Sequence, residues 1–157
     1  RDKIMLVILD NRTTAMTGEQ PYPGVPIDGM GDTAPEVSIE EIVKAAGVGF
    51  AKIIEPFNLK KAGEAFTQAL QYDGVAVVIA KHPCAQITAR ERRAKGIHIV
   101  FDVDQDKCSR CMICVRDFAC PAIYVAIGGS VHIDALLCVG CGVCRQVCPD
   151  NAIEVRK

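Results

Sequence analysis

Eight of the nine cysteines of this chain lie between residues 108 and 148, in two sets of four. Each set has three cysteines spaced three residues apart, followed by a fourth that directly precedes a proline. The sets form an internal repeat with a period of thirty residues, which aligns the cysteines at 108, 111 and 114 with those at 138, 141 and 144. The end of the chain must therefore adopt a fold organised around its thiols.

The second set, CVGCGVCRQVCP, has the C-x2-C-x2-C-x3-C-P spacing of a bacterial ferredoxin run. Three cysteines at this spacing wrap one loop around a cubane cluster, and the amides of the loop offset the cluster's negative charge. In two-cluster ferredoxins the fourth cysteine binds the other cluster. We therefore expect two [4Fe-4S] clusters, with Cys108, Cys111, Cys114 and Cys148 as ligands of the first and Cys138, Cys141, Cys144 and Cys120 as ligands of the second.

Disulfides and structural zinc are the alternatives for these cysteines. Disulfides suit small secreted domains, and no signal peptide is visible. Zinc usually takes paired C-x2-C knuckles rather than triplets followed by Cys-Pro. A segment of about sixty residues also has a marginal core of its own, which bound clusters would stabilise.

The composition is that of a globular protein, with 50% apolar and 24% charged residues and a net charge of −1. This charge gives no general attraction to nucleic acid, and the longest apolar runs are too short to span a membrane. We therefore expect neither a nucleic-acid partner nor a membrane span. The chain does not begin with methionine, which favours a piece of a longer polypeptide.

The pattern of residues 1–96 predicts an α/β domain with a parallel sheet. Strands are expected at 3–10, 50–54 and 75–80, and the apolar first strand is typical of a sheet covered on both faces. Ser38 and Asn58 are expected to cap two helices. The predicted inward residues of these helices are Ile39, Ile42, Val43 and Ala46, and then Leu59, Ala62, Phe66, Ala69 and Leu70.

Residues 97–157 are predicted to form a small α+β two-cluster domain, joined to the first by a charged connector at 87–96. A strand is expected at 97–103, with His98 facing solvent. A hairpin is expected from 122–126 and 131–133 around Gly128-Gly129, closed by the strand at 153–155. Ile123 and Ile153 are expected to shield the clusters from water.

The loop from Asn11 to Glu36 follows the first strand and is a candidate binding site, because ligands of such sheets bind outside the carboxyl ends of strands. The amide oxygen of Asn11 and the carbonyl of Thr13 suit Mg²⁺, which in turn binds phosphate. The alternative is a mobile turn.

The order of features resembles the large (alpha) subunit of the indolepyruvate:ferredoxin oxidoreductase family, in its C-terminal part. The residues that carry the resemblance are LDN, RTTAMTGEQPYPG, KHPCA and the two cysteine runs, the first with five residues before its Cys-Pro. This family belongs to the thiamine-diphosphate-dependent 2-oxoacid:ferredoxin oxidoreductases. The resemblance implies oxidative decarboxylation of a 2-oxoacid to an acyl-coenzyme A, with electrons passed through the clusters to ferredoxin.

The resemblance also implies roles for residues of the loop. Asn11 and Thr13 would hold Mg²⁺ and the diphosphate of thiamine diphosphate, and Thr17-Gly18 would lie beside the thiamine ring. Met16 stands where pyruvate-oxidising relatives have asparagine, which favours an arylpyruvate; packing alone is the alternative. The resemblance assigns no catalytic side chain within this chain.

The family's Gly-Asp-Gly motif is absent. The implied partners are therefore the remainder of the large subunit or another chain, a small beta subunit and an external ferredoxin, in the cytoplasm of an anaerobe. Two alternatives stay open: a non-catalytic electron-transfer subunit, and an oxidoreductase for pyruvate, 2-oxoglutarate or phenylglyoxylate.

The run Lys81-His82-Pro83-Cys84 departs from the family's Arg-Glu-Pro-Cys. Cys84 is expected to be a buried thiol, with a further cluster ligand or redox thiol as the alternative. His82 is expected at the surface. Residues 90–95 are expected to form a solvated helix face, with contacts to coenzyme A phosphates or an acidic ferredoxin as the alternative.

Overall fold

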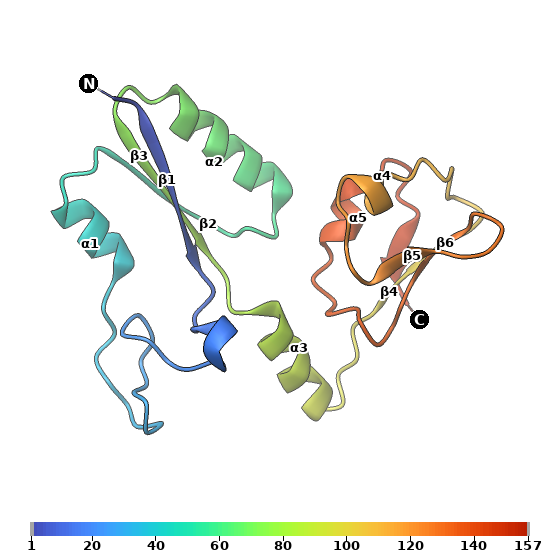
Figure 1. Ribbon diagram of the computed structural model, residues 1–157, viewed down its shortest axis with the longest axis horizontal. Coiled ribbons are helices and arrows are strands. Elements are labelled where there is room, and N and C mark those ends of the chain that lie inside the picture. The colour runs from blue at the N-terminus through green and yellow to red at the C-terminus, as the bar shows by residue number, and fades with distance from the viewer. Residues whose placement is uncertain (1, 157) are drawn as a thin grey trace. The chain divides into compact units, whose positions relative to one another are not determined.

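The computed structural model describes residues 2–156 and divides between Cys84 and Ala85 into two compact units. The first unit contains a three-stranded parallel sheet in the order β1 (Ile4–Asp10), β3 (Val75–Lys81), β2 (Phe50–Ile54) (Figure 1). In its register Asp10 lies opposite Lys81, so the carboxyl ends of β1 and β3 coincide. The predicted parallel α/β architecture is confirmed.

Both helices of the sheet unit begin at the predicted caps. The Ser38 side chain accepts a hydrogen bond from the Glu41 amide at 3.1 Å and opens α1 (Ile39–Ala45). The Asn58 side chain accepts from the Lys61 amide, also at 3.1 Å, and opens α2 (Leu59–Gln71). Each cap satisfies an amide that the first turn of a helix leaves unpaired.

Successive side chains of β3 point to opposite faces, and the two helices cover one face each. Val77 and Ile79 pack against Val43 of α1. The other face packs against the alanines of α2 and consists of Ala76, Val78 and Ala80. The centre of the core is thus β3, whose residues 76–80 are all buried.

Several predicted core residues are exposed instead. On the helices, Ile42 is 56% and Leu70 is 66% exposed, and Leu59 and Ala46 are also exposed. For α2 the reason is that the helix contacts the sheet through small residues, and its leucines lie outside this contact. One of these small residues, Ala65, was missed by the prediction. The prediction that β1 is covered on both faces is also wrong for the described residues, since β1 is an edge strand with Ile4, Leu6 and Leu9 exposed.

The second unit begins with α3 (Ala85–Ala94), so most of the expected connector at 87–96 is helical. The elements that follow are β4 (Phe101–Val103), α4 (Ile113–Arg116), β5 (Ile123–Val125), β6 (Val131–Ile133), α5 (Val143–Val147) and β7 (Ile153–Val155). The antiparallel hairpin of β5 and β6 is confirmed, with Gly128 and Gly129 at positive φ in its turn.

Two strand predictions for this unit are wrong. β7 does not close the hairpin; it pairs antiparallel with β4. The strand expected at 97–103 forms only at its end, because the three residues of β7 pair with 101–103. His98 lies in the segment before this strand, and it is exposed as predicted.

The core of this unit is built around its thiols. Phe101, Val131, Ile123 and Ile153 are buried in it together with Cys138 and Cys144. Four further cysteines pack against the same core: Cys108, Cys114, Cys120 and Cys148. Among residues 2–156, no helix has the length and apolar character needed to cross a membrane.

Candidate functional sites

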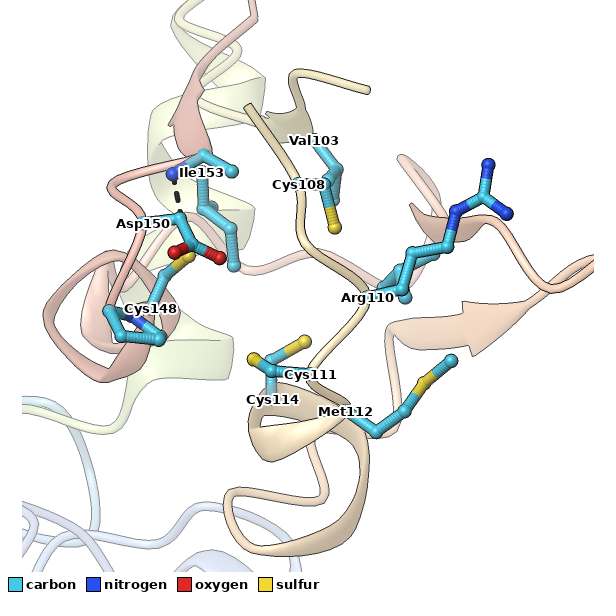
Figure 2. Close-up of a pocket in the computed structure, with 12 residues that line it drawn as sticks. Val103, Cys108, Arg110, Cys111, Met112, Cys114, Cys148, Asp150 and Ile153 are labelled. Carbon is cyan, nitrogen blue, oxygen red and sulfur yellow. Dashed lines mark hydrogen bonds between the residues drawn. The ribbon is translucent and has the colours of Figure 1, made fainter. Parts of the chain in front are cut away.

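The first set of cysteines lines one cavity (Figure 2). Cys108 and Cys111 come from the loop that leads into α4, Cys114 lies in α4 itself, and Cys148 follows the end of α5. Apolar side chains of Val103 and Ile153 line the same cavity. The fourth cysteine of the second run has therefore joined the first three of the first run, which is the arrangement that the spacing predicts.

The second set shows the reciprocal arrangement. The pKa of Cys144 is raised to about 12, first by burial and then by the neighbouring thiols of Cys141, Cys138 and Cys120. In the first set the pKa of Cys114 is also raised, by burial and then by Cys111, Cys148 and Cys108, against a lowering by a backbone hydrogen bond. Such crowded thiols resist ionisation, so metal must displace their protons when it binds.

These sets differ from a site for one ion. Within the described residues, no three His, Cys, Asp or Glu side chains are placed to hold a single metal ion. The four thiolates around a cubane each bind a different iron, so they need not converge as closely. The donor set and its spacing fit a cluster in both places.

The backbones of the two cysteine loops follow the same path. Arg110 and Met112 in the first loop have φ of 59° and 64°, and Gly140 and Gly142 in the second have 69° and 74°. One backbone amide also reaches a sulfur, since Ala152 N–H donates to Cys148 Sγ at 3.3 Å. Bonds of this kind to cluster sulfurs are among those that set a cluster's potential.

The candidate site in the first unit lies where β1 and β3 end. The Asn11 side-chain oxygen accepts from the Thr13 amide at 3.2 Å, and the Asn11 carbonyl accepts from the Cys84 amide at 2.9 Å. Thr13 is buried, and its hydroxyl donates to the Gln20 carbonyl at 3.2 Å. The structure thus brings the two predicted magnesium ligands into one tight turn.

The other predicted loop residues occupy a short 3-10 helix, η1 (Ala15–Thr17), and the left-handed Gly18 after it. The Thr17 hydroxyl donates to the Gln20 side chain at 2.8 Å, and that side chain donates back to the Thr17 carbonyl. Met16 is 102% exposed, so interior packing within this chain does not explain it.

A polar network that the sequence reasoning missed anchors the long loop to the sheet. Asp10 is only 4% exposed; it accepts from the Tyr22 hydroxyl and lies 3.5 Å from Arg12 Nη1. Arg12 also pairs with Glu36 at 3.0 Å, so residues at both ends of the loop meet. No periodic signal in the sequence marks these four residues.

Four further residues differ from their predictions or qualify them. Cys84 is half-buried rather than buried. His82 is also half-buried and packs against Phe57, with ring centroids 4.3 Å apart and the ring planes tilted by 48°. At the end of α3, residues 90–95 are exposed as predicted except for Arg92, which is half-buried, and both Arg92 and Arg93 donate hydrogen bonds to carbonyl oxygens of the second cysteine loop.

Comparison with known proteins identifies both units. The model of the C-terminal TPP binding domain of thiamine pyrophosphate enzymes matches residues 1–80, which is about half of the chain. The model of the 4Fe-4S binding domain matches residues 131–154, which include the second cysteine run. No solved structure matches this chain.

Curated relatives match nearly the whole chain. A protein of Methanothermobacter thermautotrophicus named indolepyruvate oxidoreductase subunit IorA is 51% identical over 98% of this chain and 24% of its own length. A protein of Pyrococcus abyssi with the same name is 40% identical over the same shares. A dihydromethanopterin reductase (acceptor) of Methanosarcina mazei is 39% identical over 34% of this chain and 23% of its own length. The chain spans about a quarter of the length of the indolepyruvate oxidoreductase subunits.

Proposed function

Because this chain belongs to the thiamine pyrophosphate enzymes, through their C-terminal TPP-binding domain, we propose that it is part of a 2-oxoacid:ferredoxin oxidoreductase. Its substrate is indolepyruvate or another arylpyruvate, the product is an acyl-coenzyme A, and two [4Fe-4S] clusters carry the electrons to ferredoxin. The observation that carries the proposal is the pair of reciprocal four-cysteine sets in the same chain as a TPP-binding domain.

In this proposal each cluster takes three ligands from one loop and one from the other run. Cys108, Cys111, Cys114 and Cys148 bind the first cluster. Cys138, Cys141, Cys144 and Cys120 bind the second. The crossed fourth ligands join the two halves of the repeat, so the clusters also hold this small unit together.

The thiamine site uses the turn at the end of β1. Asn11 and Thr13 supply oxygen ligands for Mg²⁺, which neutralises the diphosphate, while Thr17 and Gly18 face the thiamine ring. Thiamine diphosphate, when bound, supplies the carbanion stabilisation that lets carbon dioxide leave a 2-oxoacid. The chain's own part is to orient the cofactor, and the Asp10 network keeps the loop in place for this.

Substrate selection is assigned to Met16, whose exposed thioether side chain offers an apolar contact to an aromatic ring. Residues outside this chain complete the pocket. The proposed partners are the remainder of the large subunit or another chain, a small beta subunit and an external ferredoxin, in the cytoplasm of an anaerobe.

The test uses the enzyme assembled anaerobically with its partner chains. We expect about eight iron and eight acid-labile sulfide ions per copy of this chain, and reduction of ferredoxin that depends on indolepyruvate, thiamine diphosphate and coenzyme A. Asn11→Ala should abolish turnover and leave the iron content unchanged.

Two results would contradict this function. Zinc or disulfides in place of iron and sulfide would exclude the clusters. Full clusters without binding of thiamine diphosphate would leave a plain electron-transfer subunit.

A further inference from the structure

The last turn of α3 carries two arginines whose side chains reach the second cysteine loop, residues 138–144. Arg92 Nη2 donates to the Val139 carbonyl oxygen at 2.7 Å. Arg93 Nη2 donates to the Cys138 carbonyl oxygen at 2.8 Å. Two guanidinium groups are therefore fixed on the backbone at the first cysteine of this loop.

The internal repeat supplies a comparison, because Ser109 stands thirty residues before Val139. Ser109 meets a carboxylate instead: its amide and its hydroxyl donate to Asp150 Oδ2 at 3.3 and 2.5 Å. Asp150 lines the cavity of the first cysteine set (Figure 2). Arg110 lines this cavity too, but its side chain runs away from the cysteine sulfurs in Figure 2.

These contacts place opposite charges beside the two cysteine sets. Reduction adds one negative charge to a cluster, so a fixed cation nearby favours the reduced form and a fixed carboxylate opposes it. A guanidinium stays charged at any working pH. Its bonds to the loop carbonyls also hold the backbone whose amides face the cluster.

We propose that Arg92 and Arg93 are positioning residues that raise the reduction potential of the cluster bound by Cys138, Cys141, Cys144 and Cys120 above that of the other cluster. The inference rests on the proposed function, since it requires both clusters. In this step between the clusters, one electron leaves the reduced first cluster and enters the oxidised second cluster, with no bond made or broken. The inequality gives this transfer its direction.

The experiment is a redox titration of the intact protein, followed by electron paramagnetic resonance, which resolves the two clusters. In the double variant Arg92→Gln/Arg93→Gln we expect one midpoint to fall by at least 59 mV, which is a tenfold change for one electron, while the other stays in place. Asp150→Asn should raise the other midpoint. Arg92→Lys/Arg93→Lys keeps the charge and should retain part of the difference.

Lys95→Gln is the matched control, because it removes an exposed positive charge just beyond the same helix and should move neither midpoint. The iron content of every variant is measured first. If the glutamine double variant does not retain its iron, the test is made with Asp150→Asn and with Arg92→Lys/Arg93→Lys. If the native protein holds both clusters and the substitutions do not shift the two midpoints separately, this inference is wrong and the proposed function stands. If the native protein holds no clusters, both are wrong.

Discussion

Arg110 and Gly140 stand at equivalent positions of the two cysteine loops, and both have a left-handed backbone, with φ of 59° and 69°. The two positions differ in the space around them. A Cβ at Gly140 would lie 2.5 Å from the Ile99 carbonyl oxygen, whereas the Arg110 side chain is exposed. The same turn therefore tolerates a side chain in one loop and excludes it in the other.

Gly140→Ala should destabilise the second unit by about 2–4 kcal/mol. The left-handed conformation costs a non-glycine residue about 1–2 kcal/mol, and the clash with Ile99 adds strain. We expect a lower melting temperature, followed by the loss of the visible absorbance of the clusters. Arg110→Gly is the opposite change, and it should leave stability unchanged or raise it by about 1 kcal/mol. Equal losses in the two variants would refute the steric argument.

The crossed ligand sets predict which pairs of cysteine substitutions act on the same cluster. Cys120→Ala/Cys141→Ala removes two ligands of one set and should leave about four irons per chain. Cys120→Ala/Cys111→Ala removes one ligand from each set and should leave almost none. Iron and acid-labile sulfide assays distinguish these outcomes, and Cys84→Ala should keep the full content. The reverse pattern would show that each run binds its own cluster.

The crossed sets are also the part of the site that the sequence predicted best. Cysteine spacing encodes ligand geometry directly, because a loop of seven residues fixes where three thiols can point. The parallel sheet was equally accessible, since the buried run of β3 and the capping residues Ser38 and Asn58 are local signals.

Other features depend on tertiary context, so the sequence could not supply them. The pairing of β7 with β4 joins residues about fifty positions apart, and nothing local distinguishes it from closure of the hairpin. The contact of Arg92 with Val139 is equally remote, so no local signal predicts it. The burial of Asp10 likewise follows from the path of the loop that brings Tyr22 to it.

Tyr22→Phe should make stability less sensitive to alkaline pH. The pKa of Tyr22 is raised from 10.0 to about 12, mainly by burial and then by its hydrogen bond to Asp10, so the fold favours the neutral hydroxyl. This contribution is complete below pH 10.0 and is lost as the pH rises to about 12. Denaturant titrations should show that the variant is less stable by about 1–2 kcal/mol at pH 8. The difference should shrink between pH 10 and 12, and a constant difference would contradict the role of the hydroxyl.

Met16→Asn tests the choice of substrate in the assembled enzyme. Met16 is fully exposed, so its replacement should not change the melting temperature or the iron content. If the side chain contacts the substrate's ring, the ratio of kcat/KM for indolepyruvate to that for pyruvate should fall at least about tenfold, because a lost apolar contact in a pocket costs about 1–3 kcal/mol. Met16→Leu keeps an apolar side chain of similar size and should preserve the ratio. Met16 would have no part in selection if the ratio were the same in all three proteins, and specificity would then lie with residues that the partner chains supply.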